Sequence, residues 1–365
     1  MVNRKHRVAL AAGLAATCLV LTAGCGGSSS DETSDTSTEK SGDAGKGKGK
    51  GKGGKNAAPL LTVAEANKIV DTYQALNNEA NAKLSPALIA KAEAGAMLAF
   101  DKGYFTQASG LDQKNVKANL AGFVYVNRAF YIPPAAANTD WFMVRAQGAE
   151  LKDGKPGAPW TTGTRFIVFK HTADGWRAVN SQDFSGDEQK KIPEIALDAD
   201  GLARVAEPTA KIGGTAPADL ADLVADLYVT GGADTPLART TARENAISAY
   251  NNRLNGLDGH AYNDYKKAAP RVGTTYALRT KDGGALVLND SAVDETSLAK
   301  DLTSYITLGK RLKPFVKKGA SDHMYQVVNH EMQMEVGVIA PSGTPAVYGL
   351  EQQTTSVDAT PMSTV

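Results

Sequence analysis

The chain has 365 residues, with 40 Lys and Arg against 39 Asp and Glu and a net charge of +1. This balance argues against a nucleic-acid-binding protein, for which a strongly basic face is expected. The only cysteines are Cys18 and Cys25, so a framework of several disulfides is excluded and burial of apolar groups must hold the fold together.

Residues 1–24 have the pattern of a secretory signal peptide. A basic start that includes Arg4 and Arg7 precedes an apolar, uncharged run from Val8 to Leu21. This run is shorter than the roughly 20 residues that cross a bilayer, and its length is typical of the apolar region of a signal peptide. We therefore predict that the chain is exported.

Cys25 comes shortly after this apolar run and directly follows Ala23 and Gly24. This order resembles the bacterial lipobox, although Thr22 stands where Leu is usual. The resemblance implies cleavage before Cys25 and attachment of a diacylglyceryl group, with fatty acyl chains such as palmitate, to its thiol. Two acyl chains anchor a protein stably, whereas a single chain binds a membrane only marginally. The alternative is a plain secretory signal followed by an incidental cysteine.

Residues 25–58 are polar and rich in glycine. A stretch of Ser, Thr, Asp and Glu at 28–43 is followed by alternating Gly and Lys at 45–55. Such a composition cannot bury enough apolar surface to fold, so we predict a disordered tether. Its lysines either contact anionic headgroups or wall polymers, or belong to a solvated spacer.

Residues 59–200 are predicted to form a first α+β module. Thr62 and Glu65 make a capping-box pattern before an amphipathic helix, and a second helix is expected to begin after Ser85 and to continue to Phe100. Segments rich in β-branched and aromatic residues then predict antiparallel strands at 120–132, 141–146, 165–169 and 176–179.

The order of these elements over about 60–184 resembles the cone-shaped fold of the nuclear transport factor two and polyketide-cyclase-like superfamily. The resemblance rests on element order and carries no signature motif. It implies a curved sheet that wraps a long helix and leaves a pocket.

A linker rich in Gly and Pro at 201–216 is predicted to precede a second α+β module at 217–365. Helices are expected at 217–228 and after a capping box formed by Thr241 and Glu244. Strands are expected at 275–278, 285–288, 324–339 and 346–352, followed by a flexible C-terminal tail. The predicted fold is therefore α+β, with two tandem modules of N-terminal helices packed on a curved antiparallel sheet.

The segment 120–132 carries apolar residues on both faces of a predicted strand. One interpretation is that the second face lines a pocket, to which Tyr125, Asn127 and Arg128 supply the polar groups. The other is a central strand buried on both sides. Both remain open at this stage.

His330 is the fourth candidate pocket residue. On an extended strand, its side chain shares a face with methionines, whereas Glu331 and Glu335 lie on the other face. This parity favours a hydrogen-bonded core or pocket histidine over a metal ligand. The pair Asp294-Glu295 lies in a polar stretch and is expected in a solvated loop. We predict no catalytic residue, metal or cofactor.

The leader, tether and alanine-rich α+β ectodomain resemble lipoproteins of uncharacterised function from actinobacteria. The resemblance implies a lipid-anchored protein on the outer face of the cytoplasmic membrane. We expect a binding or interaction module without catalysis, whose partner is a cell-envelope protein or a small apolar ligand, and no nucleic acid. The alternatives are an enzyme of cyclase or isomerase type that uses a pocket, and a scaffold that uses its surface.

Overall fold

The fold is taken from a computed structural model. The described residues are 7–9, 57–112, 116, 122–152, 154–254, 260–270, 273–301, 303–319 and 321–362. Cys25, most of the predicted leader and nearly all of the predicted tether lie outside these residues, and what was said of them stays a prediction.

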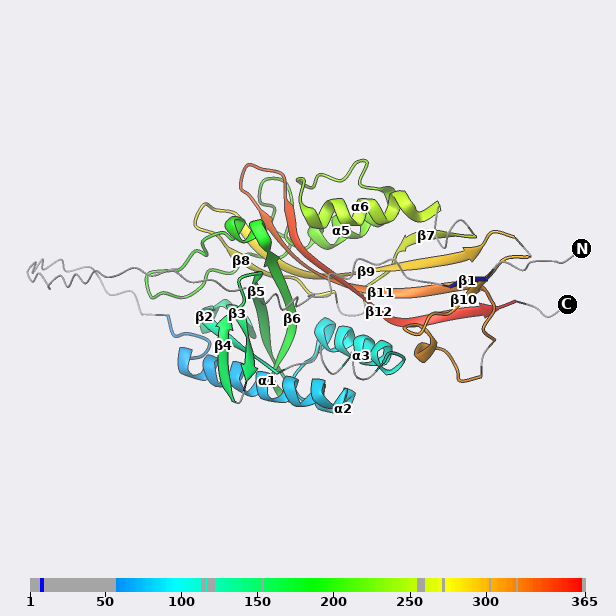
Figure 1. The fold of residues 1–365 in the computed structure, drawn as a ribbon. Coiled ribbons are helices and arrows are strands. Elements are labelled where there is room, and N and C mark those ends of the chain that lie inside the picture. The colour runs from blue at the N-terminus through cyan, green and yellow to red at the C-terminus, as the bar shows by residue number, and fades with distance from the viewer. Residues whose placement is uncertain are drawn as a thin grey trace, which may run out of the picture.

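Two antiparallel sheets lie between two groups of helices, so the molecule has four layers (Figure 1). This arrangement confirms the predicted α+β class with two sheet-based modules. The helices are α1 (Val63–Lys83), α2 (Pro86–Ile89), α3 (Gly95–Ser109), α5 (Asp219–Thr230) and α6 (Thr241–Asn252), with the 3₁₀ helices η1 (Ala135–Ala137), η2 (Gly186–Lys191) and η4 (Lys313–Phe315).

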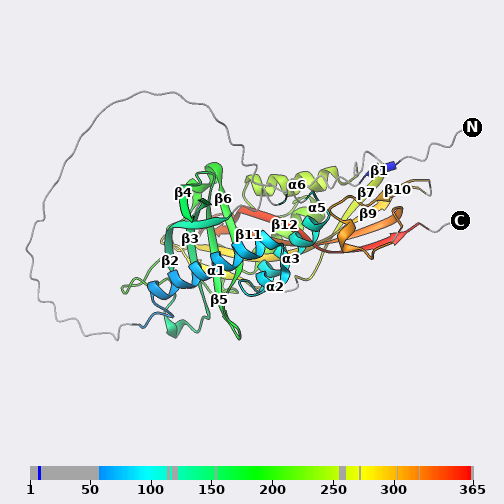
Figure 2. The ribbon, with the colours of Figure 1, turned by 60° about the horizontal axis from the view of Figure 1, so that its bottom comes forward.

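The first sheet has the order β2-β3-β5-β6, and β4 pairs with β3. Its outer face is covered by the helices that precede it in sequence, α1, α2 and α3, which come forward in Figure 2. Its strands are β2 (Phe123–Tyr131), β3 (Trp141–Lys152), β4 (Lys155–Pro159), β5 (Gly163–Thr172) and β6 (Gly175–Ser185).

The second sheet has the order β1-β10-β11-β9-β7, with β12 paired to β11 and β8 to β9. Helices α5 and α6 cover its outer face (Figure 1). Its strands are β1 (Arg7–Ala9), β7 (Ala261–Lys267), β8 (Tyr276–Arg279), β9 (Ala285–Ala299), β10 (Tyr305–Thr307), β11 (Met324–Ile339) and β12 (Ala346–Pro361).

The inner faces of the two sheets share one apolar core. Phe166, Phe184 and Val168 of the first sheet pack with Leu286 and Leu288 of the second, and all five are fully buried. The apolar residues of both inner faces therefore lose contact with water only when the two modules are together.

The predicted helix from Ser85 to Phe100 is wrong as one continuous element. It stops after α2 and begins again with α3 at Gly95, whose φ is 60°. Between the two helices, Ala178 of β6 donates its N–H to Ala92 O, and Ala94 donates to Ala178 O. The segment is thus held as a bridge to β6, which a helical pattern in sequence does not reveal.

Three other predictions need correction. The segment predicted as a possible central strand is β2, an edge strand that pairs only with β3 within the described residues. The cap of α6 is Thr240, whose hydroxyl accepts from Arg243 N, and not Thr241. The last strand continues past Gln352 to Pro361, so these residues pair with β11 and do not form a flexible tail.

Candidate functional site

A cluster of charged side chains lies where the first sheet, its helices and β12 of the second sheet meet. We call it the junction site. It contains Tyr73 of α1, Glu93, Asp101 of α3, Tyr125 of β2, Arg165 of β5, Asp183 of β6 and Glu351 of β12.

Close backbone approaches place these elements together. A Cβ atom added to Gly103 of α3 would collide with Thr354 O of β12, and one added to Gly349 of β12 would collide with Asp183 O of β6. Glycine at these two positions lets α3 and β6 lie directly against β12. The break between α2 and α3 turns Glu93 into the same region.

Arg165 and Asp183 are cross-strand partners and form a bidentate ion pair. Arg165 Nε donates to Asp183 Oδ1 at 2.8 Å, and Nη2 donates to Oδ2 at 2.6 Å. Burial alone would lower the pKa of Arg165, but the charge of Asp183 raises it well above its usual value. The guanidinium group is therefore always charged and mostly committed to Asp183.

Glu351 lies beside this ion pair and shares its cation, Arg165, with Asp183. Its Oε1 is 4.0 Å from Arg165 Nη2. The side chains of Arg165, Asp183 and Glu351 keep 27%, 21% and 40% of their surface accessible, so water reaches them among the surrounding elements. Burial nevertheless raises the pKa of Glu351, and the charges of Asp183 and Asp101 add to the increase, against the opposing effect of Arg165.

Glu93 and Asp101 form an acid pair on the helix side of the site. Glu93 is only 1% exposed, and its Oε1 accepts from Asn77 Nδ2 at 3.1 Å and from Tyr73 Oη at 3.4 Å. Burial and then the charge of Asp101 raise the pKa of Glu93 well above its usual value.

Asp101 is the more readily ionised member of the pair. Burial raises its pKa to about 6, while the hydrogen bond from Glu93 and the charge of Arg165 act in the opposite direction. Arg165 is the one cation among the residues of the junction site. The site has more carboxylate groups than cations to pair with them.

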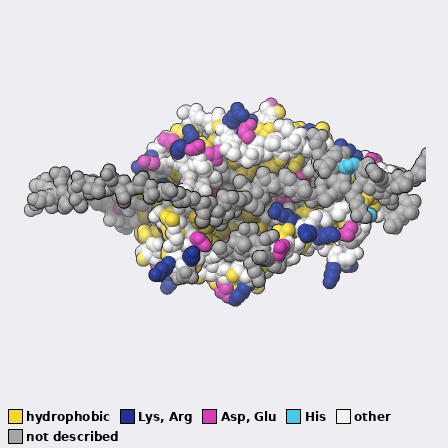
Figure 3. All heavy atoms as spheres, viewed as in Figure 1, with side chains coloured by type: hydrophobic (Ala, Val, Ile, Leu, Met, Phe, Trp, Pro, Cys, Tyr) yellow, Lys and Arg dark blue, Asp and Glu magenta, His cyan; other side chains and the backbone are white. Residues whose placement is uncertain are grey.

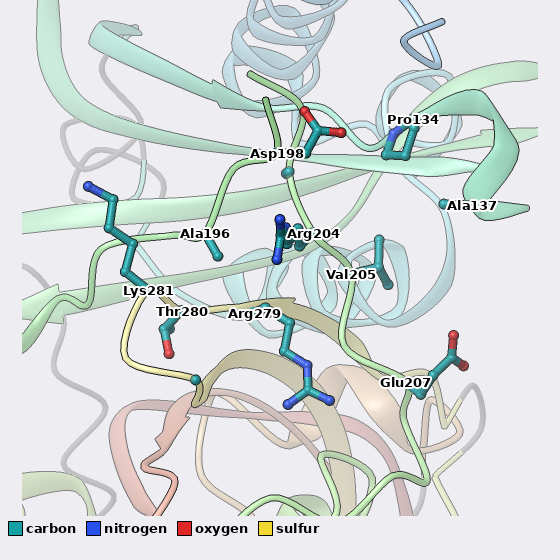
Figure 4. A pocket seen from close by; sticks show the side chains of 12 residues that line it. Pro134, Ala137, Ala196, Asp198, Arg204, Val205, Glu207, Arg279, Thr280 and Lys281 are labelled. Carbon is teal, nitrogen blue, oxygen red and sulfur yellow. The ribbon is translucent and has the colours of Figure 1, made fainter. Parts of the chain in front are cut away.

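A second candidate site is a pocket of about 640 Å³ built around the segment that connects the two modules. It is lined by Ala196, Asp198, Ala203, Arg204, Val205 and Glu207 of that segment, by Pro134 and Ala137 after β2, and by Arg279, Thr280, Lys281 and Gly283 at and after the end of β8. Figure 4 shows Arg204 and Arg279 beside each other in the middle of the lining. We call it the linker pocket.

Buried carboxyl groups also lie beneath α5 and α6. Glu331 and Glu335 of β11 are 2% and 0% exposed, and Thr354 Oγ1 donates to Glu331 Oε1 at 2.7 Å. Burial raises the pKa of Glu331 to about 8 and that of Glu335 well above its usual value. Among the described residues, no Lys or Arg makes an ion pair with either carboxyl group.

The structure separates the residues that were predicted to line one pocket. Tyr125 belongs to the junction site. Asn127 is exposed at a bulge of β2 with a φ of 51°, and its Nδ2 donates to Gln147 Oε1. Arg128 pairs with Asp71 of α1 at 2.7 Å.

His330 lies elsewhere, on β11 between β9 and β12. Its Nδ1 is 2.8 Å from Asp294 Oδ1, and its Nε2 is 3.1 Å from Asp358 Oδ2. Although burial alone would lower the pKa of His330, these two carboxylates raise it. Asp294 and Glu295, expected in a solvated loop, lie within β9, and Glu295 is only 7% exposed.

Sequence reasoning missed most of the residues that carry charge in the two candidate sites. One available signal was a charged residue at the start of an apolar run, as Arg165 precedes Phe166 to Phe169. Another was the position of two arginines. Arg279 directly follows the predicted strand at 275–278, and Arg204 lies near the start of the predicted linker. Neither signal indicates which distant residues come together.

The described part of the chain gives no evidence for a metal site or for a membrane-spanning helix. It contains no group of three or more His, Cys, Asp or Glu side chains arranged to hold a metal ion. None of its helices is both long and apolar enough to cross a membrane. On the face shown in Figure 3, basic and acidic side chains are interspersed.

These features define an α+β protein with two modules, a charged site at their junction and a pocket at their linker. The domain family described as "Domain of unknown function (DUF8094)" matches residues 57–359, and the chain belongs to this family. The chain is also similar to an uncharacterised lipoprotein of Streptomyces coelicolor. The two are 28% identical over 306 residues, which cover 81% of this chain and 80% of the relative.

Proposed function

We propose that the chain is a lipid-anchored extracytoplasmic binding protein whose junction site takes a small organic cation. Two observations support the location. The leader ends in the lipobox-like order Ala23-Gly24-Cys25, and the Streptomyces relative is described as a lipoprotein. The outer face of the cytoplasmic membrane, the lipid on Cys25 and the domain limits at 200 and 217 are part of this proposal.

The observation that supports a cationic ligand is the excess of carboxylate groups over cations at the junction site. Glu351 is 40% accessible, and its pKa is raised by burial and by neighbouring carboxylates. The guanidinium group of Arg165 donates two hydrogen bonds to Asp183 and is the one cation of the site, so its single charge is shared among Asp183, Glu351 and Asp101. A protonated amine would supply the missing positive charge and would bring the pKa values of both carboxyl groups down.

The same observation favours a polar ligand over the small apolar ligand expected from the sequence. Tyr73 and Tyr125 lie with nearly parallel rings 6.4 Å apart and are buried in the core at the inner end of the site, so they close the site on that side. The likeness to the nuclear transport factor two superfamily stays a prediction.

A calorimetric titration with spermidine at pH 7.5 and low ionic strength tests the binding proposal. We expect binding by the unchanged protein and at least a tenfold loss of affinity in Glu351→Gln, which removes one charge and keeps the shape of the side chain. The exposed Glu150 lies on β3, outside the site, so Glu150→Gln is the matched control. Equal affinities for all three proteins, or no binding by any of them, would show the proposal to be wrong.

Acid–base catalysis is a second candidate function, favoured by the pair of Glu93 and Asp101. A neutral carboxylic acid beside a carboxylate whose pKa is about 6 supplies a proton donor and an acceptor. A catalytic site would convert its bound ligand, and Asp101→Asn would stop the conversion without preventing binding. A binding site would return the ligand unchanged, as mass spectrometry of the released ligand would show.

A further inference from the structure

The linker pocket brings two arginines directly opposite each other. Val205 and Leu278 form an antiparallel bridge, and Arg279 N donates to Arg204 O at 2.8 Å. In an antiparallel pair, residues directly opposite each other place their side chains on the same face. Arg204 is one residue before this bridge and Arg279 one residue after it, so the register places them opposite each other, and both line the pocket (Figure 4).

Neither guanidinium group has a carboxylate within ion-pair distance in the described part of the chain, although Asp198 and Glu207 also line the pocket. Within the described part of the chain, no ion pair involves Arg204 or Arg279. Like charges directly opposite each other on a sheet are destabilising, and Arg279 is half-buried, which reduces screening by water. The two positive charges therefore repel each other across the register, and a bound anion would relieve this repulsion.

The other charged groups of the lining are Lys281, Asp198 and Glu207, and the first two are engaged by neighbouring groups. Lys281 Nζ is 2.6 Å from Glu194 Oε2, so its charge is already matched. Asp198 Oδ1 accepts from the backbone N–H groups of Asp200 and Leu202 and thereby fixes the turn of the linker. The two arginines are therefore the cations of the lining that remain available to a ligand.

We infer that the linker pocket binds a phosphate group carried by a small molecule or by a phospholipid headgroup. Guanidinium groups bind phosphate oxygens in a bidentate manner. A phosphate monoester carries a charge of about −1.5 to −2 at pH 7, which matches the two positive charges of the arginine pair. The volume of about 640 Å³ lies within the range of small-molecule sites, so room remains for the group that bears the phosphate.

This site is independent of the proposed function at the junction site. Its residues belong to the linker and β8, and the charge of its ligand is opposite to that of the organic cation proposed there. Loss of binding at one site does not imply loss at the other.

Calorimetric titration of the full-length protein in detergent with glycerol 1-phosphate, at constant ionic strength, tests the inference. We expect binding at a single site, and at least a tenfold loss of affinity in the double variant Arg204→Gln/Arg279→Gln. Lys281→Gln removes one positive charge from the same pocket but leaves the arginine pair intact, so we expect less than a threefold change. Arg204 is exposed, and Arg204→Gln alone therefore tests the site in a variant whose packing is unaltered.

Vesicles distinguish the two sources of phosphate. The lipid anchor inserts into phosphatidylglycerol and phosphatidylcholine vesicles alike, so only a preference for the former that the double variant loses would assign the pocket to a headgroup. Binding of glycerol 1-phosphate without such a preference would assign it to a free phosphorylated molecule. If the unchanged protein binds neither probe, or if the double variant binds both as the unchanged protein does, the inference is overturned.

Discussion

At the scale of single residues, buried carboxyl groups make the stability of this fold depend on pH. Glu331 lies under α5 and α6, where burial raises its pKa to about 8, against about 4.3 in an unfolded chain. The folded state therefore binds this proton more tightly than the unfolded state. The resulting stability is fully present below about pH 4.3 and is lost as the pH rises to about 8.

Replacing Glu331 by Gln should reduce the loss of stability at alkaline pH. Gln cannot ionise, and its side-chain oxygen can still accept the hydrogen bond from Thr354 Oγ1. We expect Glu331→Gln to exceed the unchanged protein in free energy of unfolding by roughly 5 kcal/mol at pH 9, with a much smaller difference at pH 4. Urea denaturation across this pH range measures the effect.

The exposed Glu150→Gln is the control for this measurement and should keep the pH dependence of the unchanged protein. Glu335 is also buried and its pKa is also raised, so part of the alkaline decline remains in Glu331→Gln. Parallel pH curves for Glu331→Gln and the unchanged protein would contradict the assigned role of this carboxyl group.

At the scale of secondary-structure elements, patterns within a short stretch of sequence predicted the start of a helix and the position of a strand, because both depend on residues that are close together in the chain. The capping box of Thr62 and Glu65 begins α1, and the alternating run that ends at Ile339 is β11, as expected. The break after α2 was not predictable, because Ala178 of a distant strand holds the chain there. The edge position of β2 likewise depends on strand order, which its own residues do not encode.

The contact between β12 and β6 depends on the absence of a side chain at Gly349. A Cβ atom there would meet Asp183 O, and it would lie 2.8 Å from Val336 Cγ1. We expect Gly349→Ala to lower the free energy of unfolding by about 1–3 kcal/mol, the usual cost of overpacking. Chemical denaturation measures the loss.

Gly163→Ala on β5 is the matched control for Gly349→Ala. Its nearest contact would be Phe184 O at 3.5 Å, an ordinary separation, so we expect little change in stability. Because Asp183 holds Arg165, Gly349→Ala should also weaken spermidine binding at the junction site. Stability and binding equal to those of the Gly163→Ala control would contradict the proposed close approach of the two modules.

At the scale of the whole molecule, the two sheets form one shared core, and the candidate sites lie along their boundary. The sequence predicted the α+β class because helical and strand patterns are local. It did not predict the junction site, because Glu93, Arg165 and Glu351 are far apart in the chain and meet only through the packing of both modules. Tyr125 was the one predicted pocket residue that lies in that site.

Anchoring at the membrane is the central claim about the whole molecule, and it depends on one residue. Cleavage before Cys25 would also remove Arg7–Ala9, the strand paired with β10, so β10 would become the edge of the second sheet. The shared core includes no residue of the leader and should be unaffected.

Tandem mass spectrometry of the N-terminal peptide of the native protein, purified from membranes, tests this claim most directly. We expect the chain to begin at Cys25 and its thiol to carry a diacylglyceryl group. A chain that begins at another residue, or a free Cys25 thiol in protein recovered from the culture medium, would contradict the account.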